Sequence, residues 1–202
     1  MKKFYTLILT AGFILTIIIS NSVGFIKDGR KLDQLRESVL RLHILADSDS
    51  EEDQRLKLCV RDAILEQSSE LFGEADDLES AEKAALEAMP EIVDIAENTL
   101  NAQGCDSTVR AYLADMEFDE RVYGNITMPS GKYRALRIEI GEAKGHNWWC
   151  VMYPPLCIPA AEDVKSRDEK KYFDEKELDI VYHPKKYRVK FALWDKIKGI
   201  FD

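Results

Sequence analysis

Residues 39–50, VLRLHILADSDS, place a strand, a turn and a helix start next to one another, and the rest of the fold follows from them. The first eight residues, 39–46, are rich in β-branched and apolar side chains, which is typical of a β-strand. Side chains alternate along a strand, so Arg41 and His43 would share one face and the leucine and isoleucine that follow them the other. The Asp and Ser residues that come next predict a turn.

A helix is predicted directly after that turn. Ser50 and Asp53 have the spacing of a capping box, in which side chains satisfy free N–H groups at the helix start. Apolar and small side chains then recur at helical spacing and predict the face that packs on a sheet. They are Leu56, Cys59, Val60, Ala63 and Ile64. Gln54, Lys57 and Arg61 fall on a different face, which leaves them available for another role.

The remainder of the chain predicts an α+β fold. A second helical region, 78–102, contains Pro90, whose missing amide hydrogen predicts a kink or two separate helices. Segments rich in β-branched and aromatic residues then predict strands at 109–118, 123–128, 133–140 and 148–152. Because helices do not alternate with these strands, we expect an antiparallel sheet covered on one face by two or three helices.

The first 26 residues predict a signal peptide or a signal-anchor helix. Lys2 and Lys3 precede an uncharged apolar run, and a run extended to Ile26 covers about 23 residues, enough to span a hydrocarbon core of about 30 Å. The two lysines favour a cytoplasmic N-terminus and export of everything that follows. The leader is either cleaved, with Val23 as the first remaining residue, or retained as an anchor.

Three further parts are expected after this leader. Residues 27–38 are polar and predict a linker, and residues 39–160 form the α+β domain. Residues 161–202 form a charged C-terminal extension. Within it the segment 187–193, YRVKFAL, alternates in polarity and predicts an edge strand, followed by a short helix.

Composition argues against two classes of function. The 202-residue chain has a net charge of −9, which disfavours binding to the phosphate backbone of nucleic acids. Its three His and four Cys form neither a CxxC nor an HxxxH pattern, so a dedicated zinc site is not expected. We therefore expect no metal and no cofactor.

The cysteines leave two interpretations open. Cys150 and Cys157 flank a loop with two prolines, and outside the cytoplasm they would form a disulfide; the alternative is two buried thiols. Either cysteine, paired with His43 or His146, would also suit an exported thiol hydrolase that acts on cell wall or peptide. Residues 146 and 150 of one extended strand lie about 13 Å apart, too far for a hydrogen bond, which weighs against that pair.

Two blocks of sequence resemble the stage II sporulation protein R family. The first runs from Arg41 to Ser50 (RLHILADSDS) and continues through the helix as DQ, LKL and VRD at 53–62. The second comprises PSGKY at 129–133 and GHNWWCVMYPPLC at 145–157. The tail after Pro159 resembles the family only weakly.

The resemblance implies an exported signalling protein of endospore-forming bacteria and not an enzyme. Family members are made in the forespore and pass through the export machinery into the space between the two cells. There they activate a membrane-embedded aspartic protease of the mother cell, which removes the pro-sequence of sigma-E. The chain would contact the membrane itself only if its leader is retained. A purely structural envelope protein is a third interpretation.

The candidate contact residues for that protease lie in the two blocks. They are Arg41, His43, Gln54, Lys57, Arg61, Trp148, Trp149, Pro154 and Pro155. A helix does not require Gln, Lys or Arg in particular, because these residues have similar helix propensities. Structural roles stay open: Arg61 would also suit a link from helix to sheet, and both tryptophans would also suit packing under a helix and a loop.

Overall fold

A computed structural model of the chain describes residues 2–67, 75, 77–154 and 172–201. The chain divides into two compact units. The larger unit comprises Arg36–Tyr172, and the smaller unit combines Met1–Leu35 with Phe173–Asp202. Each unit is described separately below.

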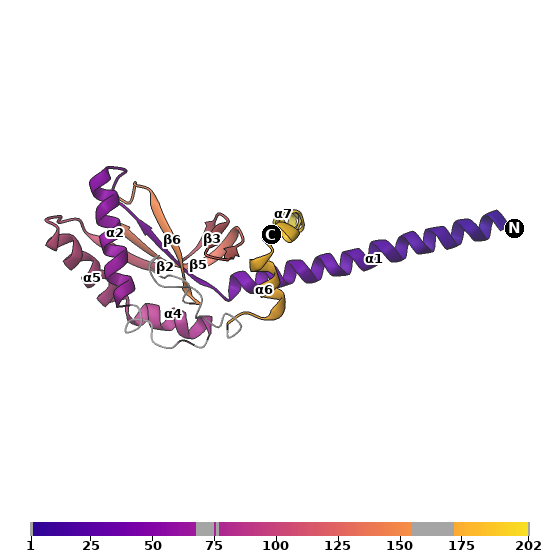
Figure 1. Ribbon diagram of the computed structural model, residues 1–202, viewed down its shortest axis with the longest axis horizontal. Coiled ribbons are helices and arrows are strands. Elements are labelled where there is room, and N and C mark those ends of the chain that lie inside the picture. Colours follow the sequence, from indigo (N-terminus) through magenta and orange to yellow (C-terminus); the bar gives the residue numbers. More distant parts are fainter. Residues whose placement is uncertain (1, 68–74, 76, 155–171, 202) are drawn as a thin grey trace. The chain divides into compact units, whose positions relative to one another are not determined.

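The larger unit is built on a four-stranded sheet with the strand order β2-β5-β1-β6 (Figure 1). Its strands are β1 (Leu40–Leu45), β2 (Val109–Phe118), β5 (Gly131–Ile140) and β6 (Asn147–Tyr153). β5 pairs antiparallel with β2, and β6 pairs antiparallel with β1. β1 and β5, however, run parallel, with Leu42 opposite Leu136. The α+β class is confirmed, and the sheet is mixed and mostly antiparallel instead of purely antiparallel.

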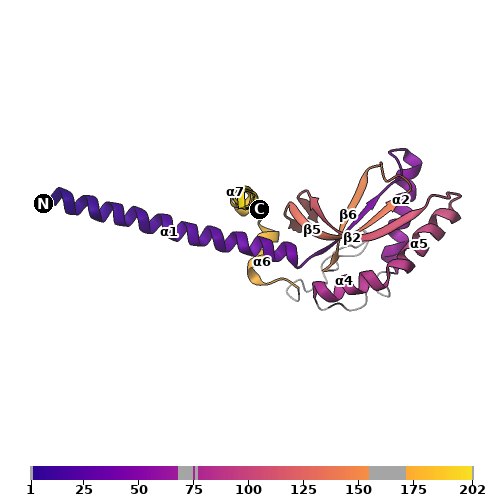
Figure 2. The same ribbon diagram turned by 180° about the vertical axis from the view of Figure 1, so that it is seen from behind.

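Helices cover one face of this sheet, as predicted. They are α2 (Glu51–Glu66), α4 (Leu78–Glu87) and α5 (Met89–Ala102). Both views show them together on one side of the strands (Figures 1 and 2). The core between helices and sheet contains Leu42, Ile44, Val60, Ile92 and Leu136, all fully buried. Burial of such side chains, each contributing about 1.5–3 kcal/mol, holds the two layers together.

The helix boundaries follow from the local sequence. The Ser50 side chain accepts a hydrogen bond from the Asp53 amide at the start of α2, as the capping-box spacing predicted. α4 ends at Glu87, and α5 begins at Met89 with Pro90 in its first turn, where no amide hydrogen is needed. The predicted interruption at this proline is therefore confirmed as two helices.

A small hairpin belongs to the opposite side of the sheet. The single strand predicted at 123–128 is wrong, because the chain turns within it: β3 (Arg121–Tyr123) and β4 (Ile126–Met128) pair antiparallel on either side of a turn at Gly124. Gly124 has a φ of +61°, a conformation that a tight hairpin turn requires and that glycine adopts without strain. The hairpin lies away from the three helices in both views (Figures 1 and 2).

The smaller unit is helical. Its first helix, α1 (Lys2–Glu37), runs without a break through residues 27–38, so the segment predicted as a linker is helical almost to its end. From Phe4 onward α1 is long and apolar enough to cross a membrane. Two further helices, α6 (Glu175–Tyr182) and α7 (Pro184–Phe201), complete the unit.

The edge strand predicted at 187–193 is wrong, because this segment lies within α7. Tyr187 and Phe191 are buried and stack on each other with ring centres 5.3 Å apart. They stand four residues apart, a helical spacing, and the apparent alternation of the segment came from sampling that helix over too few residues.

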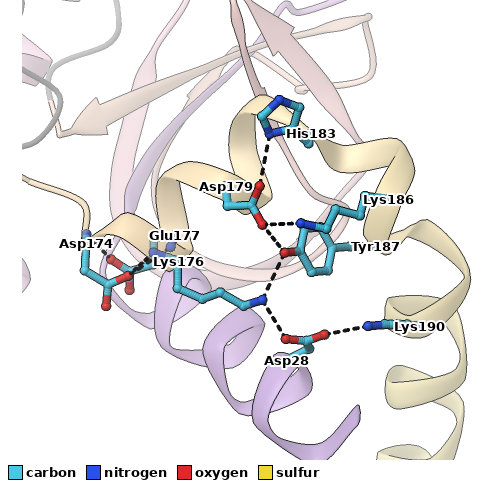
Figure 3. A network of polar contacts seen from close by, with 9 residues as sticks. All are labelled: Asp28, Asp174, Lys176, Glu177, Asp179, His183, Lys186, Tyr187 and Lys190. Carbon is cyan, nitrogen blue, oxygen red and sulfur yellow. Dashed lines mark hydrogen bonds and ion pairs between the residues drawn. The ribbon is translucent and has the colours of Figure 1, made fainter. Parts of the chain in front are cut away.

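A network of ion pairs joins the three helices of the smaller unit (Figure 3). Asp28 of α1 lies 2.8 Å from the Lys176 amine and accepts a hydrogen bond of 2.7 Å from Lys190. Burial alone would lower the pKa of Lys176, but the hydrogen bonds and charges of Asp28 and Tyr187 together outweigh burial, and the pKa is raised. Asp179 bonds to Lys186 and Tyr187, and these hydrogen bonds lower its pKa to about 2.

Candidate partner-binding surface

Arg41 lies on the sheet face opposite the helices and is fully buried. Its guanidinium stands 4.2 Å from the centre of the Phe118 ring and donates a 2.6 Å hydrogen bond to the Tyr123 hydroxyl. Aromatic faces attract such a cation, and the attraction grows when water is excluded. Arg41 therefore fixes the hairpin to the sheet. Its burial argues against direct contact with a partner, so a contact role for Arg41 stays a prediction.

His43 is buried on the same face. Its ring makes edge contacts with Phe118 and Trp149, with ring centres 6.0 and 5.9 Å apart. Burial, together with the nearby charge of Arg137, lowers the pKa of His43 to about 4, so the ring is neutral at pH 7. Neither ring nitrogen has a hydrogen-bond partner within the described part of the chain. His43 packs among aromatic rings here, and its burial likewise argues against the predicted contact role, which stays untested.

The loop at 46–50 holds the loop at 141–146 through a set of backbone contacts. The second loop donates amide hydrogens from Glu142, Lys144, Gly145 and His146 to the first. Asp47 and Asp49 accept two of these with their side chains, at 2.7 and 2.6 Å. A Cβ atom on Gly145 would collide with the Ser48 carbonyl, so this close approach requires glycine.

Gln54 and Lys57 stabilise the same pair of loops. The Gln54 amide donates a 2.9 Å hydrogen bond to the Ser48 carbonyl, and the Lys57 amine donates to Gln54 Oε1 at 2.6 Å and to the His146 carbonyl at 2.7 Å. Lys57 is buried, and burial lowers the pKa of its amine. The geometry therefore supports a structural role for both residues, although sequence reasoning placed them on the contact face.

Arg61 connects α2 to β6. Its guanidinium carbon stands 5.2 Å from the centre of the Trp148 ring, and it pairs with Asp62 at 2.7 Å. About a quarter of the Arg61 side chain is exposed. The link from helix to sheet is thus present, and part of the side chain still faces solvent.

Around these contacts, α2, β6 and the loop before β6 carry side chains that are at least partly exposed, and we call this set the α2–β6 surface. It consists of Leu58, Arg61, Asp62, His146 and Trp148. Leu58 is an exposed leucine on a helix whose core face is already packed. An aromatic ring, an arginine and an exposed leucine are residue types that protein–protein interfaces favour.

Trp149 faces the other side of β6. Its ring packs on Phe118 with centres 5.2 Å apart, and the Arg121 guanidinium lies 4.4 Å from its centre. The two tryptophans therefore point to opposite faces, as strand alternation predicts, and both are partly covered.

The end of β6 is described only in part. Pro154 is buried, and Pro155 and Cys157 lie outside the described residues. Cys150 is buried and disulfide-bonded, whereas Cys59 and Cys105 are free thiols. The pairing of Cys150 with Cys157 remains a prediction. Because it is disulfide-bonded, Cys150 offers no thiolate for the hydrolase interpretation.

Sequence reasoning missed a polar ladder on the face opposite the helices. Glu139 of β5 accepts hydrogen bonds from Arg110 at 2.8 Å, Tyr112 at 2.8 Å and Arg137 at 2.7 Å. Burial alone would raise the pKa of Glu139, but the hydrogen bonds from Tyr112 and Arg137 and the charges of Arg137 and Arg110 together outweigh burial, and the pKa is lowered. The alternation of residues 136–140 predicted that Glu139 faces away from the apolar side of the strand. It did not predict Arg110 and Tyr112 as partners, because they lie on another strand, β2. No cluster of metal-binding side chains occurs among the described residues.

The two blocks of sequence that carried the resemblance thus meet in space through the contacts of the paired loops. A family model described as stage II sporulation protein R matches residues 36–163. The chain belongs to the stage II sporulation protein R family. The matched region covers most of the larger unit and ends before α6 and α7. Membership is consistent with a role in sporulation.

One relative in this family allows a direct comparison. The chain is 35% identical to stage II sporulation protein R of Bacillus subtilis (strain 168) over 137 residues. The aligned region is 66% of this chain and 61% of that relative. No solved structure matches the chain.

Proposed function

We propose that the chain is an exported sporulation signal that activates a membrane-embedded protease of the mother cell and thereby starts pro-sigma-E processing. The observation that carries the proposal is the family match over residues 36–163. The apolar helix α1 supports the proposed export, because as a signal or anchor it would direct the matched region to the membrane that the chain crosses. The protease and the space between the two cells are parts of the proposal.

The state of the histidines and cysteines also favours a ligand over a thiol hydrolase. A thiol nucleophile needs a thiolate with a base within hydrogen-bond reach. Cys150 is disulfide-bonded, and burial keeps the imidazole of His43 neutral and among aromatic rings. His146 is engaged by Asp49 through its Nδ1 atom and its backbone amide.

The α2–β6 surface is the proposed contact with the protease. It lies beside the paired loops, so the two family blocks both contribute to it, and it keeps an apolar and an aromatic side chain partly exposed. Lys57, Gln54 and the loop aspartates hold its backbone in place. Such rigid support reduces the entropy that binding would otherwise cost.

Reconstitution tests this proposal. The full chain, the candidate protease and pro-sigma-E are produced in one host, and removal of the pro-sequence is measured. We expect processing only when all three proteins are present. Processing that is equally complete without the chain would contradict the signalling role.

A matched pair of variants then tests the surface. Leu58→Asp places a charge on the α2–β6 surface, and Leu86→Asp places the same charge at an exposed leucine of α4. We expect the first variant to reduce processing at least tenfold and the second to retain it, with both as stable as the parent. Equal processing by both variants would show that the contact lies elsewhere.

A further inference from the structure

α7 carries an exposed apolar stripe on a strongly basic helix. The stripe consists of Val189, Leu193, Ile197 and Ile200, which are 42–73% exposed and follow one another at helical spacing of three or four residues. α7 contains six lysine or arginine residues and a single acid. This composition differs sharply from the chain as a whole, whose net charge is −9.

The stripe is separate from the face by which α7 packs within its own unit. Tyr187 and Phe191 are buried, and the Trp194 ring meets Phe25 of α1 with centres 5.9 Å apart. The Trp194 indole also donates a 3.0 Å hydrogen bond to Asp33. Trp194 occupies the space above Gly29, where a Cβ atom would collide with the ring. α7 is therefore fixed to α1 through this face, and the stripe takes no part in these contacts.

The contacts of Trp194 with α1 place α7 at the end of the apolar run of α1. Its contacts involve residues 25–33, whereas the uncharged run covers residues 4–26. The two helices also cross: α7 is seen nearly end-on in both views, while α1 runs along the horizontal (Figures 1 and 2). If α1 is upright in a bilayer, α7 lies along its surface, the orientation that interfacial amphipathic helices adopt.

The ion pairs show which way the stripe faces. Lys198 pairs with Asp33, farther along α1, and Lys190 pairs with Asp28, nearer to the apolar run. On the helical wheel Lys190 lies between the packed face and the stripe. Going around α7 from its packed face, Lys190 comes first and the stripe comes next. Because Lys190 pairs with the acid nearer to the apolar run, the stripe lies on the side of α7 that faces this run.

Charge around the stripe suits an anionic surface. Lys186, Lys190 and Lys198 already pair with acids of their own unit. Lys185 and Lys196 lie along the edge of the stripe opposite Lys190, are exposed, and form no ion pair with any residue that the structure describes. Exposed basic residues beside an apolar stripe attract the head groups of anionic lipids.

We infer that α7 is an interfacial helix that lies on the surface of the membrane crossed by α1 and binds its anionic phospholipids. The stripe enters the boundary between head groups and acyl chains, and Lys185 and Lys196 contact phosphates. The packing residues 25–33 follow the predicted cleavage position before Val23, so this contact would persist after removal of the leader. On the proposed function, the smaller unit would thereby hold the exported chain at the membrane that α1 crosses, on the side that faces the mother cell and its protease.

Site-specific fluorescence of the full chain tests the inference. Cys59 and Cys105 are replaced by alanine, and a polarity-sensitive dye is attached to Leu193→Cys in the stripe or to Ala192→Cys, an exposed neighbour outside it. Each protein is reconstituted into vesicles of phosphatidylcholine alone or with about one third phosphatidylglycerol. We expect a shift to shorter wavelength at position 193 in the anionic vesicles and a much smaller shift at position 192.

Further measurements exclude other causes of a dye shift at position 193. These causes are failure of α1 to insert, an effect of the dye itself, and self-association of the chain. A dye at Leu15→Cys must report an apolar environment in both vesicles, and failure would remove the premise that α1 is inserted. Lys185→Glu with Lys196→Glu should abolish the lipid dependence at position 193. Equal emission at 192 and 193 would overturn the inference. So would a shift at 193 without lipid that accompanies dimer formation in sedimentation, because a second copy would then cover the stripe.

Discussion

At the scale of single residues, Lys57 links α2 to the turn before β6, because its buried amine donates one hydrogen bond to the His146 carbonyl and a second to Gln54 of α2. Lys57→Met keeps the aliphatic stem and leaves the His146 carbonyl and Gln54 Oε1 without this donor. Unsatisfied buried acceptors cost about 1–3 kcal/mol, so we expect urea unfolding to show a loss of that size. Processing of pro-sigma-E should fall in the same proportion as stability.

Arg61→Ala is the matched comparison one helical turn away. It removes a partly exposed cation–π contact with Trp148, worth about 0.5–1 kcal/mol. We expect this variant to stay folded and to lose processing more strongly than stability, because Arg61 belongs to the α2–β6 surface. A Lys57→Met protein of unchanged stability would contradict the structural role given to this lysine.

His43 predicts a pH dependence of stability. Its pKa is about 4 in the folded chain, where burial keeps the ring neutral, and about 6.5 in the unfolded chain. Between these values the unfolded chain binds the extra proton, so stability is complete above pH 6.5 and falls as the pH drops toward 4. The loss should reach about 3 kcal/mol at most, which urea unfolding at a series of pH values would measure.

Comparison of two histidine variants isolates this effect from the titration of carboxylates. His43→Leu removes the titrating group and should flatten the slope between pH 4 and 6.5. His146→Gln changes an exposed histidine and should keep the slope. An identical slope in the parent and in His43→Leu would show that His43 does not cause the dependence.

At the scale of elements, Gly145 allows the loop at 141–146 to approach the loop at 46–50. A Cβ atom there would meet the Ser48 carbonyl, so Gly145→Ala should displace the paired loops and lower stability by about 1–3 kcal/mol. Gly199→Ala is the control, because its added Cβ meets nothing within 4 Å in α7 and alanine favours a helix. Thermal unfolding would separate the two. Equal stability of both variants would argue against the close approach.

Elements with a strong local pattern could be predicted from the sequence, and those defined by tertiary contacts could not. Residues 39–46 had a strand pattern, and Pro90 divided a helical region at the correct place. In 187–193 alternating polarity fitted a strand, but Tyr187, Phe191 and Trp194 repeat every three or four residues and meet α1 and α6. Only that packing distinguishes the helix from a strand.

At the scale of the whole molecule, the parallel pairing of β1 with β5 could not be predicted. These strands are separated by about 85 residues, whose described part includes α2, α4 and α5, and local sequence does not fix which strands become neighbours. The same pairing places β1 in the sheet interior and buries Arg41 and His43, which the alternation pattern alone had left exposed. Candidate residues on α2 were found from sequence, but their division into structural and exposed members required the loop contacts.

The orientation of the chain in the membrane rests on a narrow balance of charge. Lys2 and Lys3 precede the apolar run of α1, while Lys27, Arg30 and Lys31 follow it closely. Lysine and arginine favour the cytoplasmic side, so the residues after the run oppose export and the first two lysines must counteract them. Lys31 is also engaged by Asp174, but this ion pair forms only once the smaller unit has folded.

Lys2→Gln with Lys3→Gln should therefore reduce export of the full chain. A reporter that is active only outside the cytoplasm, fused after Asp202, would measure the loss. Lys27→Gln with Arg30→Gln is the matched control and should retain or increase reporter activity, because it removes charges that favour the opposite orientation. Full activity of the Lys2 and Lys3 variant would show that these residues do not set the orientation. Activity of a reporter that works only in the cytoplasm, fused to the parent chain, would contradict export itself.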